Sequence, residues 1–340
     1  MITKVKKNIQ SAEFFGYRGT VIVGVSGGSD SMALTHLLHA LQYELGFHLH
    51  IAHFNHNLRR SAKADQKFVE EVAEELNVPC SVGYWKNAKA LKKGSLEEAA
   101  RTERFKFFRR LAKKINSKVV VLAHTEDDLA ETVLMRILRG TGLQGLRGIL
   151  PRRELEDIWV IRPLLNIKKS AILTYLKKKK IPFRADPTNR QKKFFRNKVR
   201  LELLPLLARR YNHNIKEILI NLAKNAGTDY DYLENQAQKI FKKHAQCPSN
   251  RKTVSIDLNV FSAQHSAIKN MIVRLSIQWM KGDTNRLTSA HFREIESLLN
   301  DRPKGAIVHL PQGICLKKNI QYLVLFRTQP FIRDSSKIFV

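Results

Sequence analysis

The sequence predicts an α/β protein: a doubly wound parallel sheet, followed by a smaller, mostly helical domain that carries a short antiparallel sheet. Three observations predict this fold. In the first half, short runs rich in β-branched residues alternate with helical patterns of about 10 to 20 residues. A glycine-rich loop joins the first run directly to an apolar helix. Near the C-terminus, three more short runs are separated by turn residues.

The β-rich runs of the first half are short enough to be strands. The helical patterns between them are long enough to return the chain for parallel pairing through right-handed crossovers. A sheet built this way binds its ligands at the carboxyl ends of its strands. The predicted strands are residues 20–25, 48–54, 79–85 and 119–123.

A domain boundary is predicted near Arg210, which divides the chain into residues 1–210 and 211–340. The segment before this boundary is strongly basic and ends in an Arg-rich helix predicted over residues 194–207. Beyond it, periodicity predicts helices over 214–245, 266–280 and 288–300. The three short antiparallel strands are predicted over 305–310, 314–317 and 322–326.

The composition is that of a basic globular protein. The chain holds 60 Lys and Arg against 30 Asp and Glu, a net charge of +30, and its 43% of hydrophobic residues excludes a bare basic tail. Such a charge makes nucleic acid the leading partner and an anionic membrane surface the next. The net charge is +21 before residue 211 and +9 after it, so both domains can face the same polyanion.

The sequence also predicts a cytoplasmic protein with no membrane contact. No stretch approaches the roughly 18 apolar residues that span a bilayer, and no apolar run follows Lys7 near the N-terminus. The cysteines are odd in number and far apart, which suits a reducing compartment and offers neither a disulfide framework nor a C-x-x-C pair. They are Cys80, Cys247 and Cys315.

The loop after the first predicted strand reads Gly-Val-Ser-Gly-Gly-Ser-Asp-Ser over residues 24–31. Glycines let backbone N–H groups approach an anion, serine hydroxyls donate hydrogen bonds, and the helix N-terminus adds partial positive charge. The loop therefore predicts a phosphate site, although it lacks the Gly-Lys pair of a Walker A loop and is not G-x-G-x-x-G. Its predicted ligating residues are Ser26, Gly27, Gly28, Ser29, Asp30 and Ser31.

Asp30 would repel a phosphate unless a cation stood between them. We therefore expect Asp30 to bind Mg²⁺ carried by a nucleotide. The alternative is that the loop is only a turn and that Asp30 only caps the helix.

The loop resembles the PP-loop of the ATP pyrophosphatases, Rossmann-like enzymes that split ATP between its α and β phosphates to adenylate a substrate. Further segments resemble the tRNA(Ile)-lysidine synthetase family, in order from residue 20 to about 210. Asn57 departs from the pattern, because the family usually has Gly there. The matching segments are 52–59, 95–101, 122–132 (LAHTEDDLAET), 139–143 (RGTGL), 162–165 (RPLL), 186–189 (DPTN) and 196–200 (RNKVR).

This resemblance implies an ATP- and Mg²⁺-dependent ligase that forms a carbon–nitrogen bond on tRNA. The wobble cytidine of an isoleucine tRNA with a CAU anticodon attacks the α-phosphate of ATP, pyrophosphate leaves, and free L-lysine displaces AMP from C2 to give lysidine. The resemblance also implies that Asp128 and Glu131 hold the amines of lysine. Acids in the first turn of a helix are also ordinary partners of the helix dipole, and that alternative stays open.

Six arginines and one histidine complete the predicted site. The resemblance places the strand end at His53 in the nucleotide site, whereas a buried, hydrogen-bonded histidine is the alternative. Guanidinium forks suit phosphate oxygens, so several of the arginines should contact ATP or the RNA backbone. We expect Arg101, Arg196 and Arg200 to act with Asp30 in catalysis and Arg139 to bind ATP. The six are Arg101, Arg104, Arg136, Arg139, Arg196 and Arg200.

Two other functions remain as alternatives. A PP-loop enzyme that thiolates tRNA cytidine would normally carry paired cysteines or an iron–sulfur cluster, which three scattered cysteines do not provide. A non-catalytic RNA-binding protein would explain the charge but would leave the loop and the carboxylates without a task. The second domain is expected to bind tRNA; its alternatives are to cover an apolar face of the first domain or to form a homodimer.

Overall fold

The computed structural model describes residues 1–11, 17–57, 62–85, 96–184, 192, 194–282 and 287–328. The chain forms two compact units, Met1–Ala226 and Gly227–Val340. The DPTN segment predicted from the sequence lies outside the described residues. No helix in the described ranges is both long enough and apolar enough to cross a membrane.

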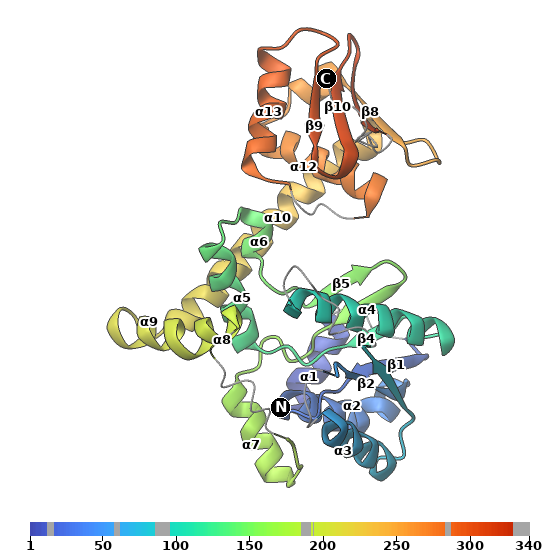
Figure 1. Ribbon diagram of the computed structural model, residues 1–340, viewed down its shortest axis with the longest axis vertical. Helices are drawn as coiled ribbons and strands as arrows, with labels where there is room; N and C mark the ends of the chain where they lie inside the picture. The colour runs from blue at the N-terminus through green and yellow to red at the C-terminus, as the bar shows by residue number, and fades with distance from the viewer. Residues whose placement is uncertain are drawn as a thin grey trace, which may run out of the picture. The chain divides into compact units, whose positions relative to one another are not determined.

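The first unit contains a six-stranded sheet in the order β3-β2-β1-β4-β6-β5 (Figure 1). All neighbouring strands pair in parallel except β5, which is antiparallel to β6 at the edge. This confirms the doubly wound parallel sheet and adds a hairpin that the sequence did not predict. The strands are β1 (Thr20–Gly24), β2 (His48–Asn55), β3 (Cys80–Tyr84), β4 (Val119–Val121), β5 (Arg152–Leu155) and β6 (Ile158–Ile161).

Alternating apolar residues bury both faces of this sheet, as the period of a strand requires. Val21 and Val23 of β1 face one apolar cluster, whereas Ile22 between them faces the other. Figure 1 shows α2 and α3 on one side of the strands and α4 on the opposite side. The covering helices are α1 (Ile2–Ile9), α2 (Ser29–Leu45), α3 (Ala62–Glu75) and α7 (Lys169–Lys179) on the first face, and α4 (Leu96–Lys114) on the second.

A separate helical cluster forms around α5 (Glu126–Leu138). Val133 of α5 packs with Val199, Leu204 and Leu219, which belong to later helices. The helix predicted over 194–207 begins near its expected start but is divided by a π-helical turn. These helices are α6 (Leu143–Leu146), α8 (Phe195–Lys198), the π-helix Val199–Leu203, α9 (Leu204–Arg210) and α10 (Ile215–His244).

The boundary between the two compact units lies further along the chain than Arg210, the position expected from the sequence. Leu219, Ile220 and Ala223 lie in the first turns of α10, and their side chains are buried in the cluster around α5. The division therefore falls inside α10, after Ala226.

The second unit carries a five-stranded antiparallel sheet in the order β7-β8-β11-β10-β9. The three predicted strands are present, and β7 and β8 extend the sheet beyond the prediction. The strands are β7 (Ala245–Gln246), β8 (Thr253–Asp257), β9 (Ile307–Leu310), β10 (Ile314–Lys318) and β11 (Tyr322–Arg327). The helices of this unit after α10 are α11 (Leu258–Ser262), α12 (Ser266–Lys281) and α13 (Ser289–Asn300).

The strand order of the first sheet fixes where a ligand can bind. The chain moves outward from β1 to β2 and β3, then returns to β4 on the other side of β1. The crossovers therefore diverge between β1 and β4, and in open α/β sheets ligands bind at the carboxyl ends of the strands on either side of such a point, which we call the crevice. The glycine-rich loop follows β1 and the LAHTEDD segment follows the end of β4, so both lie at this crevice.

Candidate active site

The glycine-rich loop connects β1 to the first turn of α2. Gly27 has a φ of 83°, a left-handed conformation that suits glycine, and its carbonyl accepts a hydrogen bond from the N–H of Arg184 at 2.9 Å. The Ser31 hydroxyl donates to the Gly28 carbonyl at 2.9 Å and lies 3.2 Å from the Ser26 hydroxyl. Internal hydrogen bonds thus shape the loop at a helix N-terminus, the geometry that suits phosphate oxygens.

His53 supports this loop from the neighbouring strand. Its side chain is buried, and its Nδ1 donates a hydrogen bond to the Val25 carbonyl at 2.9 Å. The N–H of Val25 donates in turn to the Ala52 carbonyl, which extends the β1–β2 pairing by one residue. His53 therefore contacts the backbone of the glycine-rich loop, and its expected place in a nucleotide site stays a prediction.

Asp30 forms an ion pair that sequence reasoning missed. Lys169, at the start of α7, places Nζ 2.5 Å from the Asp30 carboxylate and 2.6 Å from the Ser29 hydroxyl. Burial raises the pKa of Asp30, and the Lys169 hydrogen bond opposes that rise. No local pattern separates Lys169 from the other lysines of this basic stretch, so only the fold could reveal the contact.

Asp127 connects α7 to the start of α5. Its carboxylate accepts a hydrogen bond from the N–H of Lys169 at 3.2 Å, which caps α7, and lies 2.5 Å from Lys216 Nζ. The position of Lys169 beside Asp30 therefore depends on Asp127.

Asp128 and Glu131 bind two arginines of the matched RNKVR segment. Arg196 Nε donates to Glu131 at 2.9 Å and its Nη2 donates to Asp128 at 2.9 Å. Arg200 reaches both Glu131 oxygens, at 2.5 and 2.9 Å, and lies 3.3 Å from Asp128. Burial alone would lower the pKa of Arg200, but its contacts with Glu131 and Asp128 give a net rise. The structure thus brings together all four of these predicted residues.

Asp128 also has the helix-stabilising contact that the sequence left open. It forms a capping box with Thr125, whose N–H donates to the Asp128 carboxylate at 2.8 Å. One carboxylate oxygen therefore caps α5, and the other faces the arginines.

The remaining predicted arginines divide into three environments. Arg101 and Arg104 lie on α4, with their guanidinium carbons 5.1 and 5.9 Å from the Phe105 ring centre. Arg136 donates to the carbonyls of Gly145 and Gly148 at 2.7 and 2.8 Å, so its observed contacts are with a turn of the protein itself.

Arg139 follows the last residue of α5, and its guanidinium lies 4.9 Å from the Phe195 ring centre. Since α5 has 13 residues, Arg139 is about 15 to 20 Å along the helix from the turn that carries Asp128. Its expected contact with ATP stays a prediction.

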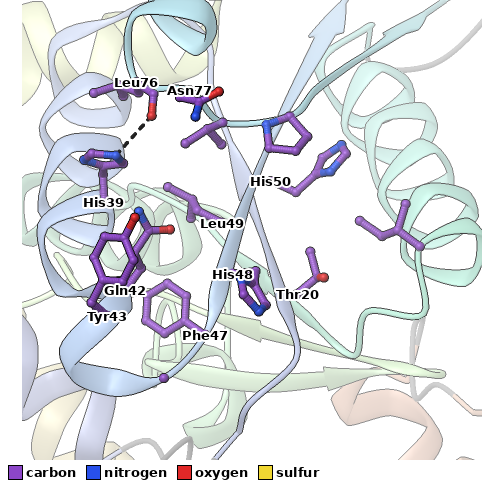
Figure 2. A pocket seen from close by; sticks show the side chains of 14 residues that line it. Thr20, His39, Gln42, Tyr43, Phe47, His48, Leu49, His50, Leu76 and Asn77 are labelled. Atoms are coloured by element: carbon purple, nitrogen blue, oxygen red, sulfur yellow. Dashed lines mark hydrogen bonds between the residues drawn. The ribbon is translucent and has the colours of Figure 1, made fainter.

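A cavity of about 550 Å³ lies elsewhere in the first unit, and Figure 2 shows it from close by. Thr20 and His48, the first residues of β1 and β2, line it together with His39 and His50. It therefore lies at the amino ends of the strands, whereas the loop and the carboxylates follow the carboxyl ends. None of the predicted site residues lines this cavity.

Comparisons with known proteins agree with the family resemblance of the sequence. Residues 1–207 match the family described as a PP-loop domain. The chain is 33% identical over 329 residues to the tRNA(Ile)-lysidine synthase of Caldanaerobacter subterraneus subsp. tengcongensis, covering 96% of this chain and 69% of that protein. It is 32% identical over 325 residues to the tRNA(Ile)-lysidine synthase of Clostridioides difficile, covering 95% and 70%.

A solved structure shares the fold. The U34-tRNA thiolase NcsA from Methanococcus maripaludis, solved with its [4Fe-4S] cluster, superimposes with a TM-score of 0.54 at 16% sequence identity. The similarity covers 66% of this chain and 78% of that chain. At this identity the likeness concerns the fold alone.

Replacing Lys169 with Met tests the Asp30 ion pair. Since Lys169 opposes the effect of burial, we expect Lys169→Met to raise the pKa of Asp30 further above its ordinary value. The measurement is a pH titration of the Asp30 carboxyl carbon by NMR, with the signal assigned by Asp30→Asn. Lys168→Met, which changes an exposed neighbour, should leave the titration as it is. An unchanged Asp30 titration in Lys169→Met would contradict the pair.

Proposed function

The chain belongs to the tRNA(Ile)-lysidine synthase family of PP-loop proteins, and from this premise we propose which of its residues carry the reaction. It is an ATP-dependent ligase that acts on the wobble cytidine of an isoleucine tRNA with a CAU anticodon. The cytidine is first adenylated with release of pyrophosphate, and lysine then displaces AMP from C2 to give lysidine. The oxygen at C2 is a poor leaving group until adenylation, so stabilisation of phosphate charge is the main chemical requirement.

One observation carries the assignment of roles. The phosphate loop and the carboxylate–arginine pairs meet at the same crevice, because Lys169 contacts Asp30 through its side chain and Asp127 through its backbone N–H. Asp128 and Arg200 both act electrostatically on Asp30. A nucleotide held by the loop would therefore place its phosphates beside Arg200.

Mg²⁺ fits this site as a companion of the nucleotide. Asp30 supplies a half-buried carboxylate, a hard oxygen ligand of the type Mg²⁺ prefers. In the ranges that the structure describes, no group of three His, Cys, Asp or Glu side chains could hold a metal ion by itself. The phosphates of ATP would supply the other ligands, and the bound ion would neutralise charge on the leaving pyrophosphate.

Lysine is proposed to bind at Asp128 and Glu131, where it would compete with the arginines already there. The two carboxylates face two guanidinium groups, so an incoming ammonium must share them or displace one. Arg200 is the more exposed of the two arginines, with 37% of its side chain accessible against 25% for Arg196. Arg200 released from Glu131 would be free to bind a phosphate, which would couple lysine binding to stabilisation of phosphate charge.

The thiolation alternative fits the cysteines poorly. A sulfur-transfer cysteine must form a thiolate, but burial raises the pKa of the Cys80 thiol to about 11. Burial also raises the pKa of Cys247 and of Cys315, and the three are free thiols.

The second unit is proposed to bind the body of the tRNA. Residues 211–340 carry a net charge of +9, and their sequence shows no motif for chemistry. Two domains that share one RNA would each neutralise phosphates.

Replacing Asp30 with Asn should slow adenylation about 100 to 1000-fold, because it removes a charge directed at the phosphates. Affinity for tRNA should stay nearly unchanged. The measurements are tRNA-dependent pyrophosphate release and a tRNA binding titration. The control is Asp157→Asn, which removes the charge of a side chain that is 91% exposed. Adenylation within threefold of the parent would remove Asp30 from the mechanism.

Replacing Asp128 with Asn should raise the KM for lysine about tenfold or more, the size expected for a missing hydrogen bond to a charged group. Pyrophosphate release at saturating lysine should change less, and Asn can still cap α5. The control is Glu126→Gln, which removes the charge of another acid in the first turn of α5. A higher KM for ATP with an unchanged KM for lysine would assign Asp128 to the nucleotide or to the helix.

Ending the chain at Ala226 tests the second unit. This variant keeps Leu219, Ile220 and Ala223, which pack in the first unit. It should bind ATP but bind tRNA more weakly, and the slope of log K against log salt should fall by about 0.7 to 0.9 for each phosphate that the shortened chain no longer neutralises. Equal affinity and slope in a folded variant would contradict the tRNA role. Aggregation or unfolding would instead indicate that the second unit covers an apolar surface or forms a homodimer.

A further inference from the structure

Four arginines gather on one side of the crevice, and we call them the arginine array: Arg101, Arg104, Arg153 and Arg162. Arg162 directly follows β6, Arg153 lies on the edge strand β5, and the other two lie on α4. Because α4 begins after β3, its first turns lie at the carboxyl edge of the sheet, where β6 ends. The β5–β6 hairpin that supplies Arg153 was absent from the sequence prediction.

The register of the hairpin shows which way Arg153 faces. Arg153 pairs with Val160, which packs in the apolar cluster beneath α4. Its neighbour Arg152 pairs with Ile161, which packs in the opposite cluster, and the Arg152 guanidinium lies 3.7 Å from the Trp159 ring centre. Since successive strand residues face opposite sides, Arg153 shares the α4 face with Arg101 and Arg104.

Among the described acidic side chains, Glu97 acts on Arg101 without forming an ion pair with it. Within the described part of the chain, none of its four guanidinium groups forms an ion pair with a carboxylate. Arg162 is 4% exposed; its Nη1 donates to the Leu150 carbonyl at 2.7 Å and its Nε donates to His124 Nδ1 at 3.2 Å. The Nε of Arg104 is buried and has no hydrogen-bond partner among the described residues.

The members of the array repel one another. Burial, followed by the charges of Arg101, Arg153 and Arg104, lowers the pKa of Arg162 to about 9. Burial, followed by repulsion from Arg101, lowers the pKa of Arg104 to about 10. Arg162 is buried and Arg104 is half-buried, whereas Arg101 and Arg153 are exposed. Clustered cations of which one is buried are costly unless an anion joins them.

His124 completes the array with a donor rather than a charge. Burial, with repulsion from Arg162 next, lowers the pKa of His124 well below its usual value, so the ring is neutral at pH 7. Because Nδ1 accepts the hydrogen bond from Arg162, the ring proton is on Nε2. A neutral His124 can therefore donate a hydrogen bond from Nε2 to an anion without carrying a charge itself.

We propose that the arginine array binds a backbone phosphate of the tRNA near the wobble cytidine; this rests on the tRNA function proposed above. Guanidinium forks match phosphate oxygens, and the array presents several of them. The phosphates of ATP are the other source of the same chemistry. They are assigned to the loop after β1, and β5 is three strands away, about 14 Å at the usual spacing between strands. A phosphate of the tRNA backbone therefore fits this distance better than a phosphate of ATP.

The test compares Arg153→Gln with Arg152→Gln, two adjacent charges on opposite faces of the same strand. We expect Arg153→Gln to weaken tRNA binding about tenfold and to lower the slope of log K against log salt by about 0.7 to 0.9, with the KM for ATP unchanged. Arg152→Gln should change neither quantity. Binding is measured without ATP or lysine, and equal melting temperatures show that both variants fold.

Three outcomes would overturn the proposal. These are an unchanged tRNA affinity and salt slope in Arg153→Gln, equal losses of affinity in both variants, and a raised KM for ATP with unchanged tRNA binding, which would assign the array to the nucleotide. Lysine incorporation by the parent protein is measured separately. Its absence, with the Arg153 effect intact, would refute the ligase function and leave the phosphate site standing.

Discussion

The helices around the candidate site depend on the ion pairs of Glu131 with Arg196 and Arg200. Only 3% of the Glu131 side chain is exposed, and both of its carboxylate oxygens contact these two arginines. Removing one partner of a buried pair typically costs about 3 to 5 kcal/mol. The pairs connect α8 and the π-helical turn after it to α5. The first turn of α5 also carries Asp128, which acts electrostatically on Asp30. A single buried carboxylate thus joins three segments of the helical cluster around α5.

Charge is distributed unevenly along this edge. The acids next to the phosphate loop are each paired with a cation: Asp30 with Lys169, Asp127 with Lys216, and Asp128 with Arg196. Toward β6 and β5, the four members of the arginine array form no such pairs with the described carboxylates. The edge is therefore balanced near the loop and strongly positive beyond it, although the whole chain carries +30. An even spread of surface charge would not produce this pattern.

Sequence reasoning succeeded where the signal was local. The β-branched runs predicted β1 to β4. The glycine-rich loop was also placed correctly, because a loop with this backbone conformation requires these residue types. Sequence reasoning failed where the structure depends on contacts between residues that lie far apart in the sequence. The contacts of Arg196 with Asp128 and Glu131 join residues 68 and 65 positions apart, and that of Lys169 with Asp30 spans 139. The four-residue strand β5 begins Arg-Arg-Glu, which is not a strand composition, and the helical period of α10 continues unbroken through the division between the units.

The order of groups along the edge suits a reaction that must bring two anions and one cation together. ATP and an RNA backbone repel each other, so an enzyme that joins them needs separate cationic sites. Here the loop follows β1, the acids follow β4, and the arginine array includes residues at β6 and β5. The acids thus lie between the two proposed phosphate sites, where an ammonium would be attracted most strongly when both are filled. In this arrangement lysine would bind most tightly after tRNA and ATP have bound. The adenylated cytidine would then react with the lysine amine rather than with water.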